Sequence, residues 1–264
     1  HYADVKERLI TGVRDKQNAI IGIDDPHGNQ IAERIRMHGV APQMITVIGE
    51  IHHGIWLKGS TLIESIDGEE HLLIDLNTAP NLRGTHNAQN AACAYAAARA
   101  CGVSPQVIVR AMQTFPGLAH RMQRIGSIGK AQLVNDSKAT NADAAAKALA
   151  SFDTIYWIAG GKPKTGGIAS LKTFFPIIRH AYLIGEAAED FARTLEGHVP
   201  VTISQTVDEA VQQAARDAQG SDSANPVILF SPACASFDQF RNFEERGDAF
   251  TAAAKAIEGF RKAN

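Results

Sequence analysis

Ser231 to Gly247 carries the densest group of chemically capable side chains in this sequence. The segment reads SPACASFDQFRNFEERG and follows an apolar run from Val227 to Phe230, which predicts a buried strand between two prolines. Small and hydroxyl residues after a strand let a ligand approach the backbone and the free amide groups at the start of the next helix. A strand-to-helix loop with buried aromatic side chains is the alternative, and the segment by itself supports both equally.

A second loop, Asn135 to Asn141, places a carboxylate, an ammonium group, two hydroxyls and two amides within seven residues. A carboxylate can accept hydrogen bonds from ribose hydroxyls, and a lysine together with helix-start amides can hold an anion. The structural alternative is a well-capped helix with Thr140 or Asn141 as its N-cap.

A third loop begins with Gly160 and Gly161 and continues with Lys162 and Lys164. The glycines permit close approach of a ligand to the backbone, and the lysines offer two cations. The loop lacks the GxxxxGK[ST] pattern and is therefore not a P-loop, and a Gly-Lys loop alone is a weak signal.

Three further groups of residues could contact a nucleotide. His120 and Arg121 are adjacent, and an arginine fork can bridge a phosphate, although an interdomain salt bridge is an equal alternative. Asn87 and Asn90 share one face of a predicted helix, and amides read nucleobase edges well; helix capping is the alternative for Asn87. Lys6 lies in the first predicted helix and, by itself, is expected to be a solvated lysine.

The elements after Gln132 explain how these loops could meet. Predicted strands alternate there with predicted helices, which is typical of a parallel sheet flanked by helices. Ligands bind beyond the carboxyl ends of the strands in such sheets, and the polar loops all follow strands. The predicted strands span 133–134, 154–159, 181–184, 201–203 and 227–230, and the predicted helices span 142–150, 169–179, 186–195, 207–218 and 243–260.

The first part of the chain has a different pattern. Short apolar runs separated by Gly, Asp and charged turns predict a small strand-rich region, followed by an alanine-rich helix and a second helix that starts at Ser104-Pro105. The predicted strands span 19–23, 44–48, 54–57, 62–66 and 72–76, and the predicted helices span 30–38, 85–101 and 105–114. We place a domain boundary near Phe115 to Ala119, which gives domains 1–117 and 118–264.

Composition excludes several classes of protein. The 264 residues suffice for one large domain or two ordinary ones, and 45% hydrophobic with 20% charged residues is ordinary for a globular protein. A net charge of −2 gives no reason to expect nucleic acid or an anionic membrane as a partner. No apolar run approaches the roughly 20 residues that span a bilayer. The three cysteines (Cys93, Cys101 and Cys234) lack metal-ligand spacing and favour a reducing, cytoplasmic setting.

The first residues already follow an amphipathic helical pattern, without an initiator methionine or a cap. Tyr2, Val5, Leu9 and Ile10 fall on one helical face. This pattern predicts that the chain is a fragment of a longer protein.

Taken together, these segments resemble the Mur ligase family, and most closely its member that adds D-glutamate to UDP-N-acetylmuramoyl-L-alanine. The resemblance covers essentially all 264 residues, in order and spacing. It rests on GTHN at 84–87, HR at 120–121, NDSKATN at 135–141, GGKPK at 160–164 and SPACASFDQF at 231–240.

The resemblance implies an α/β fold and an ATP-dependent, amide-forming reaction. Residues 1–117 would be the second half of a central P-loop-type ATPase domain, and residues 118–264 a Rossmann-like C-terminal domain with a mostly parallel sheet. ATP would convert the substrate carboxylate to an acyl phosphate, which the amine of D-glutamate attacks, with Mg²⁺ on the phosphates. Neither the UDP-binding domain nor a GK[ST] loop is present in this sequence, so the chain alone is expected to be inactive.

The resemblance also implies roles for individual residues. Lys6 would be carbamylated and bind Mg²⁺, Asn87 and Asn90 would read adenine, Arg121 the phosphates and Asp136 the ribose. The residues expected to bind D-glutamate are Lys138, Thr140, Lys164, Ser236, Phe237 and Phe243. His120 would help to position the nucleotide or the acyl phosphate and would not act as a base.

The partners implied are small molecules, namely ATP, D-glutamate and UDP-N-acetylmuramoyl-L-alanine, and we expect a bacterial cytoplasmic monomer. Two alternatives remain. Another amino-acid or polyglutamate ligase of the same superfamily is one, and the DSKATN string at 136–141 argues against it. The other is a Rossmann-type nucleotide-binding module, which predicts a GxGxxG string that is not found after Leu133-Val134.

Overall fold

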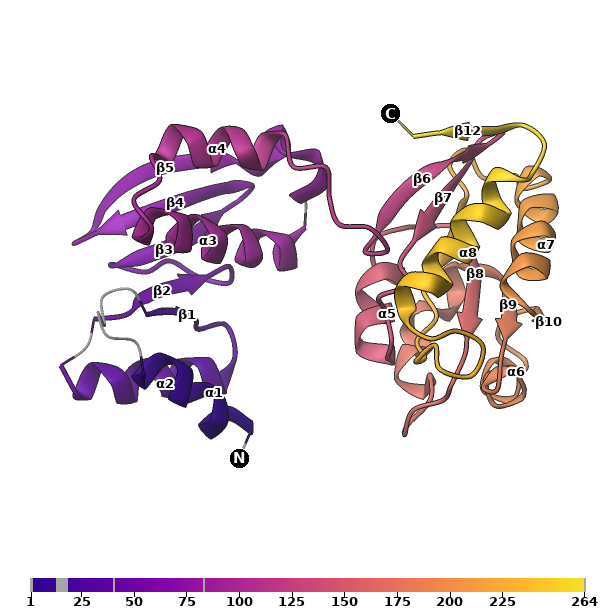
Figure 1. Ribbon diagram of the computed structural model, residues 1–264, viewed down its shortest axis with the longest axis horizontal. Coiled ribbons are helices and arrows are strands. Elements are labelled where there is room, and N and C mark those ends of the chain that lie inside the picture. Colours follow the sequence, from indigo (N-terminus) through magenta and orange to yellow (C-terminus); the bar gives the residue numbers. More distant parts are fainter. Residues whose placement is uncertain (1, 13–18, 40, 83, 264) are drawn as a thin grey trace. The chain divides into compact units, whose positions relative to one another are not determined.

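The computed structural model describes residues 2–12, 19–39, 41–82 and 84–263 (Figure 1). The chain folds as two α/β units, His1–Gly117 and Leu118–Asn264, each with its own sheet and its own core. Among the described residues, no helix is long and apolar enough to cross a membrane.

The first unit contains a five-stranded sheet whose strands are neighbours in chain order. Pairs β1/β2 and β2/β3 are parallel, whereas β3/β4 and β4/β5 are antiparallel. The strands are β1 (Ile20–Gly22), β2 (Gln43–Thr46), β3 (Gly54–Lys58), β4 (Thr61–Ile66) and β5 (Glu69–Asp75).

Helices α3 (Thr85–Ala100) and α4 (Pro105–Gln113) pack on this sheet, and the alanines of α3 bring its backbone close to the strands. Helices α1 (Tyr2–Thr11) and α2 (Pro26–Met37) share a smaller core with β1. Helix α2 starts four residues before the predicted helix, because the Asp25 carboxylate accepts hydrogen bonds from the backbone N–H groups of His27 (2.9 Å) and Gly28 (3.0 Å). Two short 3₁₀ turns, Leu76–Thr78 and Pro80–Leu82, follow β5.

The second unit contains a seven-stranded sheet in the order β10-β9-β8-β11-β7-β6-β12. The five strands from β10 to β7 are parallel, as the alternating pattern predicts, and β6 and β12 add an antiparallel edge. The strands are β6 (Gln123–Ile128), β7 (Ala131–Asn135), β8 (Ile155–Gly160), β9 (Ile178–Ile184), β10 (Val201–Gln205), β11 (Val227–Phe230) and β12 (Phe260–Lys262).

Helices cover both faces of this second sheet, so its central strands are apolar along their whole length (Figure 1). In β8, Trp157 belongs to the core beneath one layer and Ile158 to the core beneath the other. The first layer consists of α5 (Ala142–Leu149), the 3₁₀ helix η4 (Ala169–Ile177) and α6 (Ala188–Leu195), and the second of α7 (Val207–Gln219) and α8 (Phe243–Lys255).

Two predicted elements of this unit differ from the structure. The helix predicted at 169–179 is a 3₁₀ helix that contains Pro176, which has no N–H to donate, and β9 begins at Ile178. The last helix ends at Lys255 rather than at Phe260, and Phe260–Lys262 pairs with β6 across more than 130 residues of sequence. Neither β6 nor β12 was predicted.

Candidate functional site

The direction of the chain reverses between β8 and β11, and this switch point organises the candidate site. From β8 the chain builds outward to β9 and β10 and then returns through α7 to β11 on the other side of β8. The loops after β8 and β11 are joined by backbone hydrogen bonds, from Lys162 N to Ala235 O (2.9 Å), from Ala235 N to Lys162 O (3.2 Å) and from Gly160 N to Pro232 O (2.9 Å). Open parallel sheets bind their ligands at such a point.

Gly160 and Gly161 allow these two loops to meet. Both have positive φ angles (121° and 130°). A Cβ atom on Gly160 would lie 2.0 Å from the carbonyl oxygen of Ile184, and one on Gly161 would lie 2.5 Å from that of Ala235. The glycine pair is therefore required by backbone contacts within the chain, and the exposed Lys162 and Lys164 lie just after it.

Asn135, at the end of β7, lies against the His120 ring. The Asn135 side chain is fully buried; its Oδ1 accepts from Ser137 N (3.2 Å) and its Nδ2 donates to Gly247 O (2.8 Å). These partners determine the orientation of the amide, because an N–H can only donate and a carbonyl can only accept. The two hydrogens of the Asn135 amino group have three acceptors within reach, namely Gly247 O (2.8 Å), Thr251 Oγ1 (3.0 Å) and His120 Nδ1 (3.2 Å), so Asn135 links β7 to α8 and to the His120 ring.

His120 lies buried between Asn135, Asp248 and Phe243. It is 8% exposed, its Nε2 lies 3.6 Å from Asp248 Oδ1, and its ring meets the Phe243 ring edge-on. Its carbonyl accepts from Lys138 N (2.9 Å), which joins the His120 segment to the second polar loop. The predicted positioning role of His120 stays a prediction.

Asp136 is buried beneath the same segment. It is 5% exposed, with Oδ1 accepting from Met122 N (3.1 Å) and Oδ2 from Ser231 Oγ (2.9 Å). Burial raises the pKa of the Asp136 carboxyl to about 6. His120, Met122 and Ala233 have positive φ angles although they are not glycines, so this carboxylate anchors two strained segments. The predicted contact of Asp136 with a ribose stays a prediction.

Lys138 and Phe243, two of the predicted D-glutamate ligands, lie together. The Lys138 ammonium is 4.0 Å from the centroid of the Phe243 ring, and Ser137 Oγ donates to Phe243 O at 2.8 Å. Thr140 is half-buried in the same loop, directly before the helix N-cap Asn141, whose side chain accepts from Ala144 N (2.8 Å). The capping alternative is thus correct for Asn141, while Lys138 stays exposed.

Ser236 and Phe237 lie in the loop after β11. Ser236 is 2% exposed, and its carbonyl accepts from Gln239 N and Phe240 N in a tight turn, whereas Phe237 is 68% exposed. Arg121 is exposed, and its N–H donates to Leu118 O (3.3 Å).

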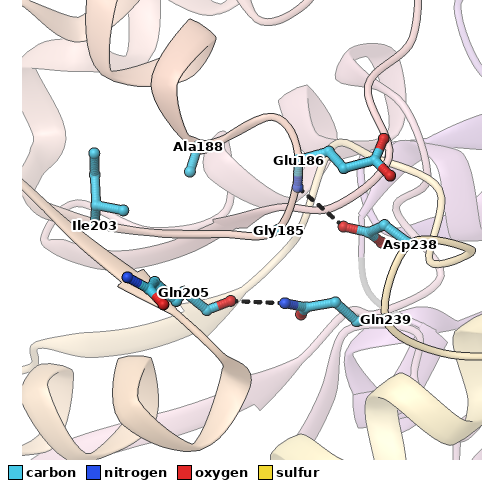
Figure 2. Close-up of a pocket in the computed structure, with 7 residues that line it drawn as sticks. All are labelled: Gly185, Glu186, Ala188, Ile203, Gln205, Asp238 and Gln239. Carbon is cyan, nitrogen blue, oxygen red and sulfur yellow. Dashed lines mark hydrogen bonds between the residues drawn. The ribbon is translucent and has the colours of Figure 1, made fainter.

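A pocket of about 300 Å³ lies beside this turn, at the carboxyl ends of β9 and β10 (Figure 2). Asp238 Oδ2 accepts from Glu186 N (3.1 Å), and Gln239 Nε2 donates to Gln205 O (2.8 Å), so the loop after β11 closes one side. None of the residues predicted from the sequence to form a site lines this pocket. Its lining residues are Gly185, Glu186, Ala188, Ile203, Gln205, Asp238 and Gln239.

Replacing Gly185 with alanine is expected to lower the free energy of unfolding by about 1–3 kcal/mol more than Gly129→Ala does. Both glycines have positive φ (65° and 57°), but a Cβ on Gly185 would lie 2.1 Å from Asp238 Oδ2, whereas one on Gly129 would have nothing within 4 Å. Urea titrations of the two variants therefore isolate the clash. Equal losses would show that the loop simply moves away from the new methyl group.

The remaining predicted site residues belong to the first unit. Asn90 is exposed and Asn87 half-buried on α3, and Gly84 rather than Asn87 occupies the N-cap position of this helix. Lys6 is exposed on α1. In the described ranges, no three His, Cys, Asp or Glu side chains are grouped so that they could hold a metal ion.

Arg246, which is not among the residues predicted from the sequence, is 1% exposed and touches two of the polar loops. Its spacing offered a signal. Arg246 lies four residues before the buried Phe250 on α8, so it falls on the apolar face of that helix.

Comparison with protein families bears on both units. The family model described as "Mur ligase middle domain" matches residues 1–98, and the one described as "Mur ligase, glutamate ligase domain" matches residues 120–234. The chain belongs to the Mur ligase family. The two matched ranges include all the site residues predicted above except Ser236, Phe237 and Phe243.

Curated members of the Mur ligase family cover nearly the whole chain. A protein of Agrobacterium fabrum named UDP-N-acetylmuramoylalanine–D-glutamate ligase is 54% identical over 259 residues, which are 98% of this chain and 55% of that protein. One of the same name from Rhodopseudomonas palustris is 55% identical, over 98% of this chain and 56% of its own. The chain thus spans about half the length of these relatives.

Solved structures show the same fold at low identity. MurF from Acinetobacter baumannii aligns with a TM-score of 0.64 and 18% identity, over 95% of this chain and 55% of its own. A Yersinia pestis bifunctional folylpolyglutamate synthase/dihydrofolate synthase, solved with AMPPNP and a Mn ion, aligns with a TM-score of 0.60 and 16% identity, over 96% of this chain and 57% of its own.

Proposed function

We propose that this chain carries the amino-acid site and part of the nucleotide site of a ligase that adds D-glutamate to UDP-N-acetylmuramoyl-L-alanine in the bacterial cytoplasm, for peptidoglycan synthesis. The observation that carries the proposal is the switch point of the second sheet. The Lys138–Phe243 pair lies there beside the loops after β8 and β11, which are joined by the bridge between Lys162 and Ala235. Curated relatives of the chain are named as D-glutamate ligases. Residues 1–117 would be the second half of the central ATP-binding domain, and 118–264 the Rossmann-like C-terminal domain.

The reaction proceeds through an acyl phosphate. The terminal phosphoryl group of ATP passes to the terminal carboxylate of UDP-N-acetylmuramoyl-L-alanine, which gives ADP and the acyl phosphate. The amine of D-glutamate attacks the acyl carbon, the bond from this carbon to the phosphate oxygen breaks, and amide, inorganic phosphate and one proton are released.

The second unit supplies binding and orientation for this step. Lys138 and Lys164 hold the two carboxylates of D-glutamate, since a charge-assisted contact is about twice as strong as a neutral one. The hydroxyls of Thr140 and Ser236 and the rings of Phe237 and Phe243 orient the amine toward the acyl carbon. His120 helps to position the nucleotide or the acyl phosphate, Arg121 contacts the phosphates, and Asp136 accepts from the ribose.

The first unit would contribute to the nucleotide and metal sites. Asn87 and Asn90 would read the adenine edge. Lys6, once carbamylated, would give one oxygen ligand for Mg²⁺, which neutralises phosphate charge when bound. Because the described residues gather no trio of metal-binding side chains, we assign no step to the metal.

Calorimetry of the chain tests the amino-acid site. D-Glutamate is expected to bind saturably and L-glutamate at least tenfold more weakly, because a site built for one enantiomer leaves polar groups unpaired with the other. Glycine, D-Ala-D-Ala and a glutamyl folate test the related ligases, and NAD tests the dinucleotide-binding module. Tight binding of NAD with no response to D-glutamate contradicts the proposal.

A second assay tests the whole reaction. The chain is joined to the part of the Agrobacterium fabrum relative that it does not cover, and ADP release is measured with ATP, Mg²⁺ and UDP-N-acetylmuramoyl-L-alanine. We expect release that depends on D-glutamate. If the joined protein is folded and makes no ADP with D-glutamate, the proposed reaction is wrong.

A further inference from the structure

Arg246 is a buried arginine whose guanidinium binds only uncharged oxygen atoms among the described residues. It is 1% exposed. Its Nη2 donates to Ser137 O (2.8 Å) and its Nε to Ser137 Oγ (3.1 Å), while its Nη1 donates to Cys234 O (3.0 Å) and Ala235 O (3.1 Å). One side chain thus binds the loop after β7 and the loop after β11.

No Asp or Glu in the described part of the chain forms an ion pair with Arg246, and the carboxylate of Asp238 favours its charged form only from a longer distance. Burial lowers the pKa of Arg246 to about 10, which still leaves it charged at neutral pH. A buried charge is costly unless its hydrogen bonds are made, and the loop carbonyls make them. Breaking these hydrogen bonds would leave a buried charge without partners, so they hold the two loops together strongly.

The groups packed around Arg246 fit a planar guanidinium. A Cβ on Gly161 would lie 3.0 Å from Nη1, so the loop after β8 also lies against the guanidinium. The guanidinium carbon lies 5.9 Å from the centroid of the Phe230 ring. Lysine has one nitrogen and cannot reach Ser137, Cys234 and Ala235 from one position.

The two loops carry most of the predicted D-glutamate ligands. Ser137 directly precedes Lys138, and Ala235 directly precedes Ser236. We call the hydrogen bonds of Arg246 to Ser137, Cys234 and Ala235 the clamp. Ser137 Oγ accepts from Arg246 Nε and donates to Phe243 O, so the clamp is connected to the residue whose ring lies against Lys138.

We propose that Arg246 is a positioning residue of the amino-acid site, where its guanidinium holds the loop that carries Lys138 and the loop that carries Ser236 at the separation that D-glutamate requires. The proposal rests on the proposed function for the identity of the ligand. Arg246 makes no contact with substrate; it acts through the two loops.

Arg246→Lys and Arg246→Met test this role in the whole chain. Lysine keeps the positive charge but has no planar guanidinium, and methionine has neither. We expect the dissociation constant of D-glutamate, measured by calorimetry, to rise by about 10-fold to 100-fold in both variants, because a displacement of about 1 Å in a binding group has effects of this size. Amide hydrogen exchange at 137–140 and 234–236 should become faster in both.

Phe250→Leu is the matched control. Phe250 lies on the same helix and is fully buried against Phe230, so its truncation loosens the core under α8 while it removes none of the hydrogen bonds of Arg246 to Ser137, Cys234 and Ala235. The control is expected to lower the urea midpoint and to leave the dissociation constant of D-glutamate within twofold of the wild-type value.

Three results overturn the inference: wild-type affinity in Arg246→Lys, wild-type affinity in Arg246→Met, or an equal loss of affinity in Phe250→Leu. A wild-type chain that binds no D-glutamate overturns the proposed function instead. In that case hydrogen exchange alone tests whether Arg246 holds the two loops in place. Unchanged exchange in both Arg246 variants refutes this role.

Discussion

Lys138→Ala is expected to weaken the binding of D-glutamate by about 30-fold, while the free energy of unfolding changes by no more than about 1 kcal/mol. The alanine variant loses a charge-assisted contact with a ligand carboxylate, which is worth about 2 kcal/mol. Within the protein, the exposed Lys138 gives up its 4.0 Å contact with the Phe243 ring. Calorimetry measures the affinity, and urea titration measures the stability.

Lys164→Ala is expected to behave in the same way, because Lys164 is also exposed in a loop at the switch point. Lys172→Ala is the matched control, an exposed lysine on η4 outside the polar loops. Affinity within twofold of the wild-type value in Lys138→Ala or Lys164→Ala, with stability retained, would remove that lysine from the proposed site.

Asp136→Asn is expected to become more stable relative to the wild-type protein as the pH rises from 4 to 7.5, by up to about 3 kcal/mol. The pKa of the Asp136 carboxyl is raised by burial from 3.8 to about 6 in the folded state. Between these values the folded wild-type protein binds more protons than the unfolded chain, so its free energy of unfolding falls as the pH rises. Asparagine has no proton to lose and keeps both contacts, accepting from Met122 N and donating to Ser231 Oγ.

Urea titrations at several pH values between 3.5 and 8 measure this difference. Asp153→Asn serves as the control, since Asp153 is exposed in a loop of the same unit. A constant difference between Asp136→Asn and the wild-type protein over this range would show that Asp136 does not titrate as a buried carboxyl. Nucleotide binding by the same variant tests the proposed ribose contact separately.

Local patterns predicted much of the fold. The alternation of short apolar runs with helical periodicity predicted five parallel strands of the second sheet, because a strand buried on both faces must be apolar along its length. Residues 169–179 were predicted as one regular helix, whereas the structure has a 3₁₀ helix that contains Pro176 and ends at Ile177, where β9 begins. The antiparallel edge was missed because the three residues of β12 are too short a pattern to detect, and because Gly126 and Ser127 interrupt the apolar pattern of β6.

The sequence by itself determined the chemistry that this chain can present: which loops carry lysines, hydroxyls and amides, and that these loops follow parallel strands and so share one edge of a sheet. Tertiary structure decided how these groups are held. Lys138 meets Phe243 across 105 residues, the Asn135 side chain contacts both His120 and α8, and Arg246 joins loops that are almost 100 residues apart. The physical reason is that periodicity of 2 or 3.6 residues records only which face of an element is buried. Contacts between loop ends depend on strand order and packing, which no local pattern contains.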